Sequence, residues 1–259
     1  MASIRVLGAY GAREKGKGTT ALQLSDTVVI DAGNLIHPLG SAAARIDHIF
    51  LTHCHMEHIA DLPFLVDAFF AQRSRPLNVY GLAHTIEQIK AHIFNWGIWP
   101  DFSEIPLIGT ETPAIVFHVI EPDRTYEVEE FRLTTVASNH LVPTIGYVIE
   151  RRGEARSIYF SADTYRCDRI WQEVNENSAI SALIVECSFP SAMERLAKSG
   201  HHLTPALLAK ELAALKRTDL RIYVNHLKPE LAPTIIYELS DHPLTSDLLV
   251  LDDGDEIEY

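Results

Sequence analysis

A dense group of possible metal ligands lies at positions 53–58, where His53, His55, Glu57 and His58 fall within six residues. Neutral imidazoles suit zinc, manganese or iron, and a carboxylate admits the harder ions of that set. On an extended strand end His53 and His55 point the same way, whereas Glu57 and His58 need the chain to turn. The group could therefore hold one metal or divide between two. The alternative, a run of histidines without a metal, is disfavoured by this density of candidate ligands.

Strands are expected to position this group and to bring other ligands to it. The apolar run 46–51 precedes the group and predicts a buried strand. Three further candidates, His140, Asp163 and His226, each follow a predicted strand. The carboxyl ends of strands are where α/β proteins gather ligands and catalytic groups. Taken singly, each of the three is more often a satisfied polar residue than a ligand.

The hydrophobic pattern predicts an alternation of strands and helices. We expect a hairpin at 21–30, strands at 3–9, 46–51, 77–80, 115–120, 126–136, 145–150, 157–160, 182–185, 221–224 and 248–251, and helices at 59–73, 84–94, 165–176, 204–217 and 229–239. Thr204 and Pro205 suit the N-cap and first position of one helix. This order is compatible with two sheets packed back to back with helices outside, in one domain over residues 1–259.

Composition restricts the possible partners. The 259 residues are 47% hydrophobic and 22% charged, with a net charge of -13. This charge argues against a broad nucleic-acid or anionic-membrane surface, although metal ions could still attract a small anionic substrate. Cys54, Cys167 and Cys187 have no CxxC spacing, which fits a reducing compartment. We see no signal peptide and no apolar run of ~18 residues, so we expect a cytoplasmic protein without membrane contact.

The candidate ligands resemble the signature of the metallo-β-lactamase superfamily. Its HxHxDH motif corresponds to positions 53–58, and its later His, Asp and His correspond to His140, Asp163 and His226. The resemblance implies an α/β fold, an αββα sandwich of two mixed β-sheets with outer helices. It also implies two divalent ions, with zinc favoured and manganese or iron as alternatives. By this resemblance, one metal is bound by His53, His55 and His140, and the other by Glu57, His58 and His226. Asp163 contacts both metals.

Within that superfamily the chain is similar, nearly end to end, to class II 3′,5′-cyclic-nucleotide phosphodiesterases. The similar stretches are IDAG (30–33), TIEQIK (85–90), IFN (93–95), IWP (98–100), YFSADT (159–164), ECSFP (186–190), HLTP (202–205) and HLKP (226–229). The similarity implies hydrolysis of the 3′ phosphoester bond of cAMP, cGMP or both to 5′-nucleotides. The nucleophile would be a metal-bridging hydroxide, which Glu57 would also help to steer.

Further residues are candidates for catalysis and substrate binding. His202, oriented by Glu186, is the expected general acid, by resemblance to the histidine–glutamate pair of related tRNA 3′-processing nucleases; a capping role is its alternative. Lys228 is expected near the phosphate, with a plain surface lysine as the alternative. Trp96 and Trp99 could stack on the base or simply pack in the core. Related folds suggest a homodimer.

Two positions depart from the family pattern. Glu57 replaces the usual aspartate and is one methylene longer, which puts the second metal in question. His201 stands where the family has glycine before HLTP, with Gly200 one place earlier. Competing functions are an RNA 3′-processing nuclease, a lactamase or thioester hydrolase, and a metal-bearing binding module. The acidic charge and the lack of a Lys/Arg-rich insertion argue against the nuclease, so we expect no stable nucleic-acid partner.

Overall fold

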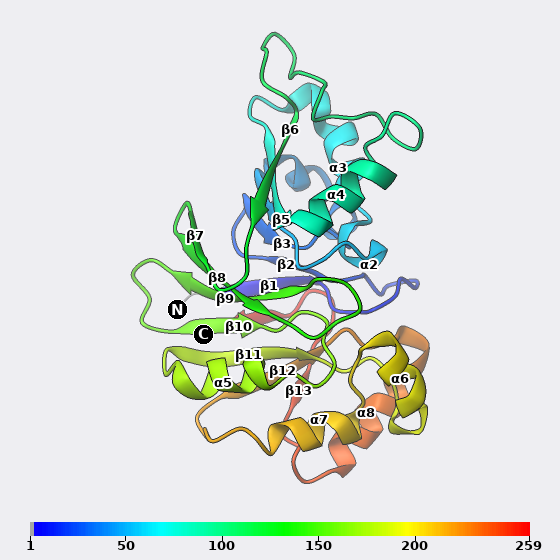
Figure 1. Cartoon of the computed structure of the whole chain (residues 1–259), viewed down its shortest axis with the longest axis vertical. Coiled ribbons are helices and arrows are strands. Elements are labelled where there is room, and N and C mark those ends of the chain that lie inside the picture. The colour runs from blue at the N-terminus through cyan, green and yellow to red at the C-terminus, as the bar shows by residue number, and fades with distance from the viewer. Residues whose placement is uncertain (1–2) are drawn as a thin grey trace.

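In the computed structural model, which describes residues 3–259, two seven-stranded β-sheets face each other (Figure 1). The first sheet contains, in spatial order, β14 (Glu256–Glu258), β1 (Ser3–Gly8), β2 (Ala21–Gln23), β3 (Val28–Ile30), β4 (His48–Phe50), β5 (Leu77–Leu82) and β6 (Ile115–Ile120). The second contains β13 (Leu249–Val250), β12 (Arg221–Asn225), β11 (Ile180–Glu186), β10 (Ser157–Phe160), β9 (Ile145–Arg151), β8 (Phe131–Ala137) and β7 (Thr125–Val128).

Helices lie on the outer side of each sheet. The first sheet carries α2 (Met56–Ile59), α3 (Leu62–Phe69) and α4 (Ala83–His92), and the second carries α5 (Asp168–Glu176), α6 (Glu194–Gly200), α7 (Pro205–Leu212) and α8 (Ala232–Asp241) (Figure 1). Short helices are α1 (Ile36–Leu39), η1 (Gly40–Arg45), η2 (Phe70–Gln72), η3 (Ser191–Met193) and η4 (Pro229–Leu231). This arrangement confirms the expected αββα sandwich of mixed sheets. Within residues 3–259, no helix combines the length and apolar character of a membrane span.

Strand direction explains why several loops meet at one edge of the second sheet. The strands β10, β11 and β12 run parallel to one another. Strand β8 runs the same way, because β8 and β10 are both antiparallel to β9 between them. These four strands therefore end at the same edge. Glu186 is the last residue of β11, and His140, Asp163 and His226 lie in the loops that follow β8, β10 and β12.

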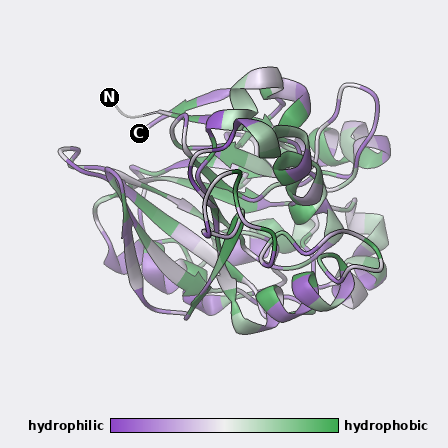
Figure 2. Ribbon diagram, turned by 90° about the horizontal axis from the view of Figure 1, so that it is seen from above, coloured by the Kyte–Doolittle hydropathy of each residue, from purple (hydrophilic) through white to green (hydrophobic). Residues whose placement is uncertain are grey.

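Two hydrophobic cores hold the layers together. One includes residues of both sheets, such as Phe50 and Tyr147, whose rings meet edge to face at 6.0 Å. The other includes Leu65 and Ile89, which belong to α3 and α4, together with buried residues of the first sheet. Figure 2 shows hydrophobic stretches along the strands and more hydrophilic stretches on the surrounding helices and loops. Each fully buried aliphatic or aromatic side chain contributes about 1.5–3 kcal/mol.

Three element predictions are wrong in their extent. The strand expected over 126–136 is a hairpin of β7 and β8, because the chain turns at Glu129, which has a φ of 50°. The helix expected over 59–73 is interrupted at Asp61, whose carboxylate accepts the backbone N–H groups of Leu35 and Ile36. The helix expected over 204–217 ends at Leu212. The hairpin over 21–30 and the Thr204 cap are confirmed.

Candidate metal centre

A change from extended to helical backbone separates the two halves of the histidine motif. Strand β4 ends at Phe50, and His55 still has an extended backbone, with φ -64° and ψ 146°. Helix α2 then begins at Met56 and carries Glu57 and His58. The turn that the sequence requires for Glu57 and His58 is thus the first turn of this helix.

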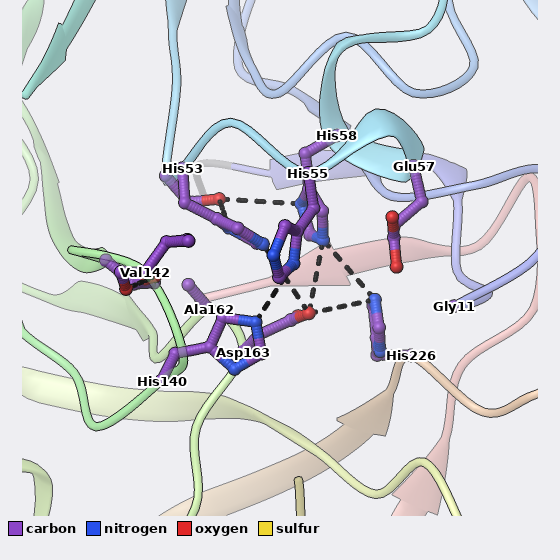
Figure 3. A network of polar contacts seen from close by, with 12 residues as sticks. Gly11, His53, His55, Glu57, His58, His140, Val142, Ala162, Asp163 and His226 are labelled. Atoms are coloured by element: carbon purple, nitrogen blue, oxygen red, sulfur yellow. Dashed lines mark hydrogen bonds and ion pairs between the residues drawn. The ribbon is translucent and has the colours of Figure 1, made fainter. Parts of the chain in front are cut away.

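The seven residues expected to bind metal come together at one edge of the sandwich (Figure 3). One group with ligand atoms within 4.8 Å of one another is His53, His55 and His140. Three further groups share Asp163, which lies with His53 and His58, with Glu57 and His226, and with His140 and His202. Figure 3 shows Glu57 and His226 beside each other, across Asp163 from His140. The Glu57 carboxylate therefore reaches Asp163 and His226 despite its extra methylene.

The donor atoms at the centre fit a divalent cation. Asp163 Oδ2 lies 3.3 Å from His58 Nε2, 3.2 Å from His226 Nε2 and 3.9 Å from His53 Nε2. Asp163 Oδ2 and His53 Nε2 are buried, yet neither finds a hydrogen-bond partner among residues 3–259. Buried polar atoms are rarely left unpaired, because desolvation without a partner is costly. A cation held by these nitrogen and oxygen atoms would satisfy both.

The protonation states of the cluster also suit metal binding. Burial lowers the pKa of His53, His55, His140 and His226, which favours the neutral imidazole that ligates metals. Burial also acts to lower the pKa of His58, but Asp163 and Asp31 hold that pKa well above its ordinary value. The Asp163 carboxylate therefore favours positive charge beside it, and a divalent cation would supply that charge.

Groups behind the ligands fix their orientation. His58 Nδ1 lies 2.7 Å from Asp31 Oδ2, and Asp31 Oδ1 also accepts the backbone N–H of Thr52 at 2.8 Å. His140 Nδ1 lies 3.1 Å from the carbonyl oxygen of His201. Such partners set the tautomer of a ligating histidine and its basicity. Asp31 was not among the expected site residues. Its position directly after a buried strand could have identified it as a candidate.

Four residues of this region have left-handed backbone conformations that side chains usually avoid. The φ angles are 59° at Asp31, 57° at Ala162, 53° at His201 and 63° at His226. Each costs of order 1–3 kcal/mol and persists only when the surroundings enforce it. The His201 conformation is the one that glycine adopts most easily, so the departure from the family glycine at this position is accommodated with strain.

A histidine–carboxylate pair adjoins the metal ligands. His202 Nδ1 lies 2.7 Å from Glu186 Oε1, and the His202 ring stacks on that of His226 with centroids 5.4 Å apart. Burial opposes protonation of His202, but Glu186 raises the pKa of His202 to about 9. Lys228 Nζ lies 3.8 Å from Glu57 Oε1 and also donates to the Gly11 carbonyl. A candidate proton donor and a cation thus adjoin the ligand cluster.

Comparison with known proteins places this site in a family. A sequence model of a β-lactamase superfamily domain matches residues 26–226. The chain belongs to the metallo-β-lactamase superfamily. The recognition of that superfamily from the ligand spacing is confirmed.

Individual relatives divide between two kinds of phosphodiesterase. The chain is 22% identical over 204 residues to a probable 3′,5′-cyclic-nucleotide phosphodiesterase of Yersinia pestis, covering 71% of this chain and 57% of the relative. It is 34% identical over 112 residues to ribonuclease Z of Thermoplasma acidophilum, covering 43% of this chain and 33% of the relative. It therefore spans between a third and somewhat over half of these curated relatives. The crystal structure of unliganded yeast PDE1 superimposes with a TM-score of 0.80 at 19% identity, covering 98% and 99% of the two chains, which supports the fold alone.

The two tryptophans make other contacts within this metallo-β-lactamase fold. Trp99 packs on the core beneath α3 and α4 and meets Phe64 edge to face at 5.1 Å. Trp96 is 60% exposed, and its indole N–H donates to Glu104 at 3.0 Å. The contacts of Trp99 match the core-packing alternative, whereas the Trp96 ring remains available to solvent.

A cavity of about 960 Å³ lies beside the metal centre but is not the metal centre. Its walls include Arg13, Lys15 and Phe64, and the ligands of the cluster are absent from its described lining. The loop between β1 and β2 separates the two, since its residue Gly11 lies against His226 while residues 13–18 line the cavity. We place the chemistry at the converging ligands, because their donor atoms gather within 4.8 Å of one another whereas the cavity lining contains none of them.

Proposed function

We propose that this chain is a metal-dependent phosphodiesterase that hydrolyses the 3′ phosphoester bond of 3′,5′-cyclic nucleotides to give 5′-nucleotides. The observation that carries the proposal is the placement of the His202–Glu186 pair and of Lys228 directly beside the ligand cluster. Phosphodiester hydrolysis needs a proton for the leaving oxygen and positive charge near the phosphoryl group. The alignment over 71% of this chain with the Yersinia phosphodiesterase supports a cyclic nucleotide as substrate.

Each ligand would serve one of two metal positions. His53, His55 and His140 would hold one divalent ion, Glu57, His58 and His226 the other, and Asp163 would contact both. When bound, such ions supply an activated water and neutralise charge on the phosphoryl oxygens. We propose zinc in both positions, with manganese or iron as replacements, because five of the seven donors are imidazoles.

The protein's own groups would then bind the substrate and move one proton. His202 Nε2–H would donate to the 3′ oxygen as the phosphorus–oxygen bond breaks, while Glu186 holds the imidazole through Nδ1 and keeps it charged. Lys228 would exchange its contact with Glu57 for a phosphate oxygen. Trp96 is the candidate to stack on the base, because most of its ring is exposed.

Ribonuclease activity is the second candidate, because the 34% identity to ribonuclease Z exceeds that to the cyclic-nucleotide enzyme. That alignment covers only 43% of this chain, and the net charge of -13 disfavours binding of a polyanion. We therefore propose that the partner is a small cyclic nucleotide and that neither nucleic acid nor membrane is bound stably. A cytoplasmic location and a homodimer complete the proposal.

Turnover of defined substrates tests these candidates. Protein loaded with Zn²⁺ or Mn²⁺ would be given cAMP, cGMP or a precursor tRNA, and the products would be separated by chromatography. We expect 5′-AMP or 5′-GMP, and loss of activity in His55→Ala but not in His92→Ala, which changes an exposed histidine at the end of α4. Cleavage of the tRNA without turnover of either cyclic nucleotide would refute the proposal in favour of the nuclease.

A further inference from the structure

Ser188 lies between His226, a candidate metal ligand, and the His202–Glu186 pair. It follows β11 by two residues and is fully buried. Its Oγ lies 3.0 Å from His226 Nδ1, 2.8 Å from Glu186 Oε2 and 3.3 Å from His202 Nδ1. One hydroxyl therefore touches a candidate metal ligand, the candidate acid and the carboxylate that orients the acid.

The single hydroxyl proton can be assigned from the partners. Two neighbours of Ser188 Oγ can only accept, the Glu186 carboxylate at 2.8 Å and the His226 carbonyl oxygen at 3.1 Å, so they take the Ser188 proton. Glu186 Oε1 accepts from His202 Nδ1, which fills the donor of that ring nitrogen. The lone pairs that remain on Ser188 Oγ can only accept, and His226 Nδ1 is 3.0 Å away. His226 must then carry its proton on Nδ1.

This assignment decides where the free lone pair of His226 points. With Nδ1 protonated, Nε2 is unprotonated and faces Asp163 Oδ2 at 3.2 Å and His58 Nε2 at 3.3 Å. The rings of His58 and His202 stack on the His226 ring at 5.3 and 5.4 Å, and Gly11 leaves room beside Nδ1, where an added Cβ would come within 2.6 Å. These contacts fix the plane of the ring, whereas the hydrogen bond of Ser188 selects which nitrogen carries the proton.

We propose that Ser188 is a positioning residue that holds His226 in the Nδ1–H tautomer and so presents Nε2 to the second metal. The inference rests on the metal centre of the proposed function, but not on the identity of the substrate. It also links the two parts of the site, since the hydroxyl that orients His226 is itself oriented by Glu186, the partner of His202. Loss of a partner behind a metal-bound histidine typically lowers metal affinity by about 10–100-fold.

Metal titration of Ser188→Ala tests this role. The two metal affinities would be measured by competition with a chromophoric chelator, without nucleotide. We expect one of the two to weaken by about 10–100-fold, and Ser188→Thr, which keeps the hydroxyl, to restore part of it. Ser157→Ala is the matched control, because Ser157 is equally buried but lies at the opposite end of β10 and its Oγ has no partner in the described chain. Two unchanged affinities in folded Ser188→Ala would overturn the proposal.

A second measurement separates positioning from a general loss of structure. In the zinc-loaded protein labelled with ¹⁵N-histidine, the His226 pattern should show a protonated Nδ1 in the wild type and an altered pattern in Ser188→Ala. An unprotonated Nδ1 in the wild type would contradict the assignment. Should Ser188→Ala not fold, Ser188→Cys retains the volume with a weaker donor, and wild-type affinities there would equally refute the role. If these effects appear while cyclic nucleotides are not hydrolysed, the positioning role stands and the proposed substrate falls.

Discussion

Replacing Glu186 by glutamine should convert the proposed acid into one that works only at low pH. Glu186 is the group that raises the pKa of His202 to about 9, against the burial that opposes it. Without that charge the pKa of His202 should fall to its ordinary value of 6.5 or lower. The protonated fraction at pH 8 would drop from about 0.9 to about 0.03, which is about a 30-fold loss of the active form. At pH 6 the same calculation gives less than a twofold loss.

The assay is a pH–rate profile of cyclic-nucleotide hydrolysis for both proteins, with metal saturating. The wild type should keep its activity until the pH approaches about 9, and Glu186→Gln should lose it progressively above 6.5. Glu211→Gln is the control, because Glu211 is also buried but its partners are Arg166, Cys167 and Trp171. A loss in Glu186→Gln that is equal at pH 6 and pH 8 would refute the reasoning, since it would show that Glu186 does not act through the charge of His202.

The same shift has a consequence for stability. A folded-state pKa raised above 6.5 stabilises the protein most below pH 6.5, and this stabilisation disappears as the pH rises through about 9. The difference in unfolding free energy between wild type and Glu186→Gln should therefore be larger at pH 6 than at pH 9.5. Urea unfolding at the two pH values measures it, and a difference that grows with pH would contradict the assignment.

Three further perturbations address the metal centre. Asp31→Asn removes the anionic partner of His58 and should weaken metal binding about 10–100-fold, measured by chelator competition; unchanged affinity would show that Asp31 is dispensable. Gly11→Ala should displace His226, because the new Cβ would lie 2.6 Å from its Nδ1, and activity should fall at least tenfold. Gly97→Ala is the control and should be tolerated, because its new Cβ would meet its nearest neighbour at 3.4 Å. Removing metal with EDTA should lower the melting temperature by about 10 °C, since a ligand at 1,000 times its dissociation constant contributes about 4 kcal/mol. An unchanged melting temperature would count against resident metals.

The local pattern of the chain was sufficient for most of the secondary structure and for the first half of the site. Alternating apolar residues identified the central strands, and the spacing of His53, His55, Glu57 and His58 indicated metal before any fold was known. Both signals lie within a few consecutive residues, where periodicity and steric limits act directly. The errors arose where tertiary contacts outweigh local propensity, as at Asp61, which binds the backbone of the α1 region and separates α2 from α3.

The roles of individual groups in the second half of the site depended on long-range contacts. His140, Asp163 and His226 meet because β8, β10 and β12 all run in one direction, which follows from the antiparallel β9 and not from any of the three sequences around them. The positioning role proposed for the Ser188 hydroxyl follows only from the three side chains around it. Sequence patterns specify which residue types are present and how the backbone repeats. Which donor faces which acceptor depends on how distant segments pack, and no local pattern records it.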